Sequence, residues 1–187
     1  MKSIILLATA AIAVPFIISS VASVKSAGTA VADRFLERSF LQTPTIPPDP
    51  KTEPPPATAD NLHAWVTSPE TAGHARAYAW RVMPLDFIYL AVLGAFLALA
   101  ATTLASTVAW PPTLATLPGW IWLIFPLAYM LADLAEDCLI ITLMTRPASI
   151  SNFTVDLLGV LRNVKIGANA LAITQIFGLG LAGCFWK

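Results

Sequence analysis

Three acidic side chains lie within five residues of one another inside an apolar stretch of the sequence. The segment "LADLAEDCLI", residues 131–140, carries Asp133, Glu136 and Asp137. Their i, i+3, i+4 spacing places all three on one face of a helix. Carboxylates inside an apolar helix are typical of proton or cation paths, and they also form ion networks that fix helix packing. In either role the acids must face protein or water rather than lipid.

The next apolar stretch supplies basic partners. Arg162, Lys165 and Asn169 follow an i, i+3, i+7 spacing and therefore share one helix face. A short connection makes the two helices an antiparallel hairpin. We expect Arg162 and Lys165 to contact the acids, and Asn169 and Tyr129 to complete the hydrogen bonds.

The depths of the acids and bases along this hairpin match. At 1.5 Å per residue, Asp133 lies about 16 Å and Glu136 about 12 Å before the end of the first helix. Arg162 lies about 9 Å and Lys165 about 14 Å past Asp156, near the start of the second. Two bases nearly neutralise three acids, which favours a structural ion network over a proton or cation relay.

The sequence contains no motif for catalysis or for a cofactor. Nothing resembles a nucleophile elbow, a P-loop or a metal site, and the only histidines, His63 and His74, lie outside the apolar segments. The two cysteines, Cys138 and Cys184, are not in a CxxC motif, and we expect them to be packing residues without a disulfide. We therefore predict no enzyme activity, no cofactor and no metal.

Composition indicates a membrane protein. The chain of 187 residues is 57% hydrophobic and 12% charged, whereas a soluble domain carries about 25% charged residues. Its mean hydropathy is +0.71. Eleven basic residues balance eleven acidic ones, which gives no electrostatic footprint for nucleic acid. The predicted fold class is all-α, an integral membrane helical bundle.

Four apolar segments are long enough to cross a bilayer, which requires about 20 helical residues. The first lies within residues 1–24 and is either a retained anchor or a signal peptide cleaved after Ser20-Val21-Ala22. The sequence therefore predicts four transmembrane helices, or three if the first is cleaved, plus short interfacial helices. The other three spans form a bundle within residues 84–187, at 85–109, 119–144 and 154–186.

A polar region over residues 25–83 separates the first two spans. We expect an amphipathic helix over 31–41, then a proline-rich linker over 44–56 that acts as a spacer or docks in an aromatic groove. A short helix capped by Ser68 follows, with Tyr78 and Trp80 at the membrane surface.

Small residues recur at three- and four-residue intervals along two of the spans. Such stripes let helix backbones approach closely, although abundant alanine also produces them without packing. We expect the fourth span to be central, with its charged face on the third span and its small face on the second span or on a partner. The expected seam residues are Ala91, Gly94, Ala98, Ala101 and Ala105 in the second span and Gly167, Ala170, Thr174, Gly178 and Ala182 in the fourth.

Lysine and arginine bias predicts the orientation. With four spans, nine of these residues lie in the polar region or near the loop between the third and fourth spans, and two, Lys2 and Lys187, lie on the other side. The positive-inside rule then places residues 25–83 in the cytoplasm, in a bacterial inner membrane. A cleaved first segment would reverse this orientation, which favours the anchor.

The segment "PLAYMLADLAEDCLI" resembles uncharacterised small prokaryotic multi-span membrane proteins in which A-D-x-x-E-D, or a close variant, lies inside a helix. The resemblance covers the second to fourth spans and implies a multi-span membrane protein, with no function, cofactor or site role attached to it.

The chain is small, has no recognisable catalytic residues, and contains small-residue seams and a tether-like linker. These features predict an accessory, structural or assembly subunit of a larger membrane protein complex. The alternative is a small proton or cation transporter or channel component that uses the intramembrane carboxylates. Expected partners are the lipid bilayer and other membrane subunits, and a homo-oligomer fits either role.

Overall fold

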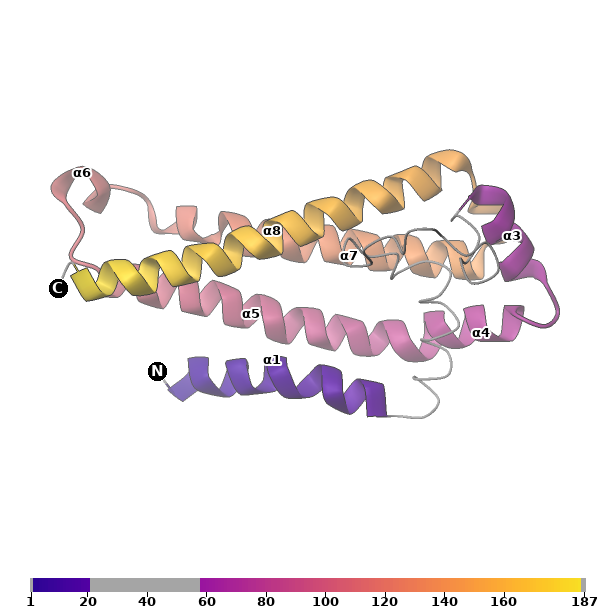
Figure 1. Ribbon diagram of the computed structural model, residues 1–187, viewed down its shortest axis with the longest axis horizontal. Helices are drawn as coiled ribbons and strands as arrows, with labels where there is room; N and C mark the ends of the chain where they lie inside the picture. The colour runs from indigo at the N-terminus through magenta and orange to yellow at the C-terminus, as the bar shows by residue number, and fades with distance from the viewer. Residues whose placement is uncertain (1, 21–57, 186–187) are drawn as a thin grey trace, which may run out of the picture. The chain divides into compact units, whose positions relative to one another are not determined.

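The computed structural model describes residues 2–20 and 58–185, and every regular element in these ranges is a helix (Figure 1). The prediction of an all-α chain is therefore confirmed for the described residues. The first apolar segment forms α1 (Lys2–Ser20). The predicted amphipathic helix over 31–41 and the proline-rich linker over 44–56 lie outside the described residues.

The chain divides into two compact units. The first comprises Met1–Phe16, Phe87–Glu136 and Gly159–Lys187, and the second comprises Ile17–Asp86 and Asp137–Leu158. Three long helices contribute residues to both units: α5 (Met83–Thr107), α7 (Ile124–Thr145) and α8 (Asn152–Phe185). With the 3-10 helix η3 (Gly119–Leu123) placed before α7, these helices agree within a few residues with the apolar segments predicted over 85–109, 119–144 and 154–186.

The first unit has an apolar core between α5, α7 and α8. One cluster joins Leu90 and Leu97 of α5 to Tyr129 of α7 and to Ala168 and Ala172 of α8. A second cluster continues along the same helices with Ala101, Ala105 and Leu179. Small side chains on α8 therefore let it pack closely on its neighbours.

The residues of the small stripe predicted for α5 differ in burial. Gly94, Ala101 and Ala105 are buried, Ala98 is half-buried and Ala91 is exposed. A Cβ atom at Gly94 would overlap the side chain of Met130 on α7. The helices α5 and α7 therefore approach each other closely along the face of α5 that contains Gly94 and Ala101.

The stripe predicted for α8 does not pack within the first unit. Gly167, Ala170 and Gly178 are exposed, and a Cβ atom at Gly167 or Gly178 would meet nothing within 4 Å. The core of the first unit instead uses Ala168, Ala172 and Leu179, which lie on the same side of α8 as Lys165. Of the two alternatives for this small face, packing on the second span is not seen at these residues within the described part of the chain, and packing on a partner stays a prediction. Lys165 and the predicted stripe lie on opposite sides of α8, and Lys165 faces α7.

The second unit has a core of its own. It contains α3 (Ala59–Thr67), α4 (Ala72–Ala77) and the π-helix η2 (Tyr78–Val82). Buried side chains from these helices meet the ends of α5, α7 and α8, and the cluster includes Leu62, Trp65, Tyr78, Met83, Ile140, Leu143 and Leu158. Tyr78 is buried in this core, whereas Trp80 is 69% exposed.

Sequence analysis misplaced the helix that precedes α5. Ser68 is the C-cap of α3 and not an N-cap, and α4 begins at Ala72. From there the helix continues without a break through Pro84 to Thr107. A proline inside a helix lacks the N–H and clashes with the carbonyl four residues earlier. The π-helical turn before Pro84, in which the Met83 N–H donates to the Tyr78 carbonyl, changes this spacing and accommodates the ring.

Local features define the starts of α7 and α8. Pro126 lies in the first turn of α7, where a missing N–H has no cost. Ser151 directly precedes α8 and forms a reciprocal capping box with Thr154. The Ser151 N–H donates to Thr154 Oγ1 at 2.9 Å, and the Thr154 N–H donates to Ser151 Oγ at 3.2 Å.

Two continuous helices among the described residues are long and apolar enough to cross a membrane. They run over Ala72–Thr107 and Asn152–Phe185. The helix between them, α7, is also apolar but contains the three acids at 133, 136 and 137.

Candidate functional site

Four charged side chains of the first unit meet in ion pairs. Arg162 Nε lies 3.3 Å from Glu136 Oε1. Lys165 Nζ lies 2.6 Å from Asp133 Oδ1 and 2.7 Å from Glu136 Oε2. We call Asp133, Glu136, Arg162 and Lys165 the charge cluster.

The helices position the charge cluster through matched spacing. Asp133 and Glu136 are separated by three residues on α7, as are Arg162 and Lys165 on α8. The base nearer the start of α8 contacts the acid nearer the end of α7, as an antiparallel pair requires. Glu136 lies between the two bases and forms an ion pair with each, one at each carboxylate oxygen.

Burial differs between the acids and the bases. The side chain of Glu136 is 1% exposed and that of Asp133 is 6% exposed, whereas Arg162 and Lys165 are 18% and 28% exposed. The acids are therefore held in the interior, and the bases reach them with long aliphatic stems from partly open positions on α8. A buried carboxylate that loses its base remains as an uncompensated charge, which is strongly destabilising.

Formal charge within the cluster sums to zero, because two carboxylates face two bases. The carboxylate oxygens that a proton or cation path would use are engaged by Arg162 and Lys165. The geometry is thus suited to holding α7 and α8 in one register.

The other predicted site residues are Asp137, Tyr129 and Asn169. Asp137 is also buried but belongs to the second unit. Tyr129 is buried in the apolar core with Leu90 and Leu97. Asn169 was expected to complete the cluster's hydrogen bonds, but its buried Oδ1 accepts no hydrogen bond from the described residues.

Gln175 makes a polar contact with Trp122 that the sequence did not predict. Its Nε2 donates to the main-chain carbonyl of Trp122 at 3.0 Å and so ties α8 to η3. The ring of Trp122 stacks on Trp110, with centroids 5.2 Å apart and planes 14° apart. A glutamine in the largely apolar stretch over 166–186 was the available signal for this contact.

The cysteines do not pack as expected. Cys138 and Cys184 are free and both are exposed, so the prediction that they are interior packing residues is wrong. Each cysteine lies on an exposed side of its helix, where its small apolar side chain contacts the environment of the protein.

Comparison with known proteins does not extend this description. Searches against protein-family models, curated proteins and solved structures found no match to the chain.

Proposed function

We propose that the chain is a small integral membrane protein and that its charge cluster and outer helix faces serve assembly rather than catalysis. The observation that carries the proposal is the apolar outer face of α8. Leu171, Phe177, Leu181 and Phe185 are 50%, 70%, 62% and 81% exposed. In water, exposed apolar surface costs about 25 cal/mol per Å². A hydrocarbon environment removes this cost.

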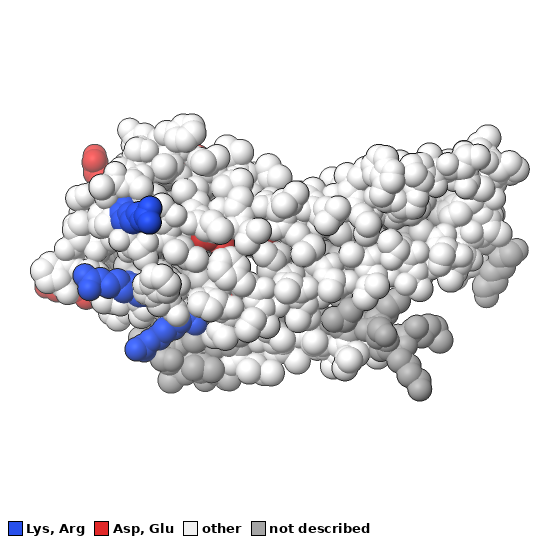
Figure 2. Space-filling view, turned by 180° about the vertical axis from the view of Figure 1, so that it is seen from behind, with Lys and Arg blue, Asp and Glu red and all other residues white. Residues whose placement is uncertain are grey.

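Most residues of the two candidate spans are not buried within the protein, which also supports a hydrocarbon environment around them. Only 28% of the most apolar window of Ala72–Thr107 is buried, and only 17% of that of Asn152–Phe185. The central helix of a soluble protein would be mostly buried. Figure 2 shows one face of the molecule, on which charged side chains are few and most of the described surface is uncharged.

The charge cluster supports α7 as a further span. Charges inside a bilayer are tolerated when they face the protein and are paired. Asp133 and Glu136 meet both conditions, because they are buried and contact Lys165 and Arg162. With α1 as a retained anchor, this proposal gives four spans in a bacterial inner membrane, with residues 25–83 on the cytoplasmic side.

The small-residue face of α8 supports a role as an accessory or assembly subunit. Gly167, Ala170 and Gly178 are exposed and lie on the side of the helix away from Lys165. Exposed small residues along a membrane helix permit the close approach of a second helix. Among residues 2–20 and 58–185, α5 and α7 pack on the other side of α8 and no side chain covers Gly167 or Gly178, so a helix of another subunit can approach this face. A larger membrane protein complex is therefore the proposed setting.

Purification from native membranes in a mild detergent tests the proposed function. We expect the tagged chain to co-migrate with other membrane proteins in a defined complex. Gly178→Leu should reduce that co-migration, because the added side chain blocks the small face of α8. Ala135→Leu is the matched control, since Ala135 is exposed on α7, outside this face. A wild-type chain that migrates as a monomer would contradict the subunit proposal.

A further inference from the structure

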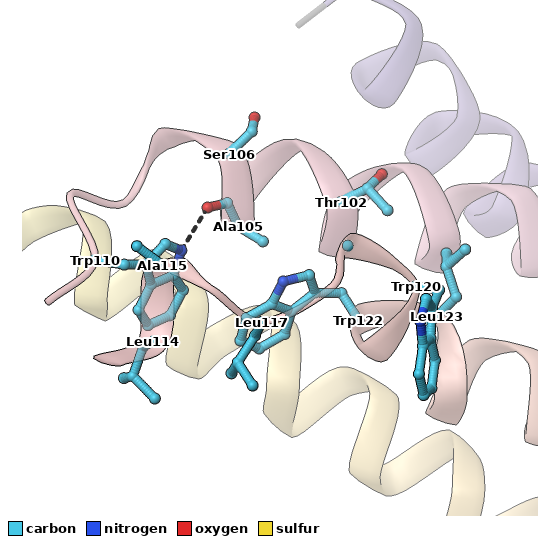
Figure 3. Close-up of a pocket in the computed structure, with 11 residues that line it drawn as sticks. Thr102, Ala105, Ser106, Trp110, Leu114, Ala115, Leu117, Trp120, Trp122 and Leu123 are labelled. Atoms are coloured by element: carbon cyan, nitrogen blue, oxygen red, sulfur yellow. Dashed lines mark hydrogen bonds between the residues drawn. The ribbon is translucent and has the colours of Figure 1, made fainter. Parts of the chain in front are cut away.

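A pocket of about 430 Å³ lies in the first unit, between the end of α5, the short helix α6 (Pro112–Ala115) and η3. Its volume falls within the 300–1,000 Å³ that small-ligand sites occupy. Figure 3 shows lining side chains from these three elements and from the connection between α5 and α6, among them Thr102, Ser106, Trp110, Leu114, Trp120 and Trp122.

Two stacked tryptophans form one wall of the pocket. Trp110 and Trp122 lie with their planes 14° apart. The Trp110 Nε1–H donates to the carbonyl of Ala105 at 2.8 Å, the dashed contact in Figure 3. Gln175 holds the main chain of Trp122. The wall is therefore fixed by contacts within the protein and presents aromatic surface to an occupant.

Polar groups at the pocket are neutral, and several are already engaged. The hydroxyl of Thr102 donates to the Ala98 carbonyl at 2.8 Å, and that of Ser106 donates to the Thr103 carbonyl at 2.7 Å. No lining residue is charged. A free fatty acid or another anion would bring a carboxylate or phosphate with no base to receive it. The chemistry therefore favours an uncharged hydrocarbon group.

The rim of the pocket is also apolar. Leu114 and Leu117 are each 38% exposed and Trp120 is 63% exposed. The connection over residues 108–118 carries no charge and follows the end of the candidate span Ala72–Thr107. Tryptophan at such a position is typical of a membrane–water interface, where the indole N–H faces polar groups and the ring faces hydrocarbon.

We propose that this pocket binds one acyl chain of a membrane glycerolipid. The hydrocarbon chain occupies the space against Trp110 and Trp122, and the exposed indole of Trp120 lies at the level of the lipid's ester carbonyls. The lipid headgroup remains outside the pocket. This inference rests on the membrane location proposed above.

Photolabelling of the full chain in nanodiscs tests the inference. The probe is a phosphatidylcholine that carries a diazirine near the end of one acyl chain, with labelled residues mapped by mass spectrometry. We expect labelling of the pocket to exceed that of the outer face of α8. Excess unlabelled phosphatidylcholine should reduce it, and excess free fatty acid should not.

Two variants make the test specific. Ser106 is exposed at the pocket, so Ser106→Trp should fill it without disturbing the core and should reduce its labelling several-fold. Ala135→Trp, on the exposed side of α7, should leave pocket labelling unchanged. Circular dichroism and elution volume establish that both variants fold.

Three results would overturn the inference. Equal labelling of the pocket and the α8 outer face would show ordinary lipid contact and would leave the membrane proposal intact. Displacement by free fatty acid would show that the ligand class is wrong. Absence of label from every apolar helix face would remove the membrane location together with the pocket proposal.

Discussion

Lys165 Nζ lies 2.7 Å from Oε2 of Glu136, on a carboxylate side chain that is only 1% exposed. The same ammonium group lies 2.6 Å from Asp133. One base of α8 therefore contacts two acids that are one helical turn apart on α7. This contact aligns α7 and α8 within the first unit, because a shift of either helix by one turn would break at least one of the pairs.

Loss of the Lys165 charge should destabilise the protein. Lys165→Met retains the aliphatic stem but leaves Asp133 without its base, while Glu136 keeps Arg162. We expect a loss of about 3 kcal/mol in the free energy of unfolding, the lower end of the range for breaking a buried pair. Unfolding in mixed micelles measures it. The control is Arg146→Met, an exposed residue outside the charge cluster. Equal stability of the two variants would contradict a structural role for the cluster.

Asp133 and Lys165 should be energetically coupled. In a double-mutant cycle with Asp133→Asn and Lys165→Met, the double variant should be more stable than the sum of the single effects predicts. Neutralising both partners leaves no buried charge, and residues in contact couple by about 0.5–3 kcal/mol. The matched cycle of Asp133→Asn with Arg146→Met should be additive. Additivity in the first cycle would show that the ion pair does not form in solution.

The register of the charge cluster is readable from sequence because it depends on two local regularities. Equal i, i+3 spacing on adjacent antiparallel helices and a short connection place Arg162 and Lys165 at the depth of Glu136 and Asp133. Apolar runs bounded by loop residues likewise locate α5, α7 and α8. These features require no knowledge of the rest of the chain.

Other features depend on tertiary context that spacing does not contain. The helix over Ala59–Thr67 has only nine residues. Its Leu62 and Trp65 are buried in a core that also contains Ile140, far along the chain. Pro84 indicates a helix start unless a π-helical turn precedes it. The stripe on α8 lies on the side away from Lys165, but spacing does not say which side of α8 packs on α5. The structure places α5 against Ala168 and Ala172, on the same side as Lys165.

The two helix faces that carry small residues should respond differently to a larger side chain. Gly94→Leu should destabilise the isolated protein by about 1–3 kcal/mol, because Met130 occupies the space that the new side chain needs. Gly167→Leu should leave the stability of the isolated protein nearly unchanged, since nothing lies within 4 Å of a Cβ there. Thermal unfolding in detergent compares the two variants. A large loss of stability in Gly167→Leu alone would mean that the α8 face packs within the chain.

If the charge cluster is structural, neither the wild type nor variants without its acids should transport protons or cations. We expect proton and cation flux through proteoliposomes to be at the level of empty liposomes for the wild type, Asp133→Asn and Glu136→Gln. Each protein is checked by elution volume after reconstitution, so that loss of folding is not mistaken for loss of flux. Wild-type flux above the liposome background that falls in both variants, with folding retained, would favour the transporter alternative. Flux that persists in both would assign any pathway to residues other than these carboxylates.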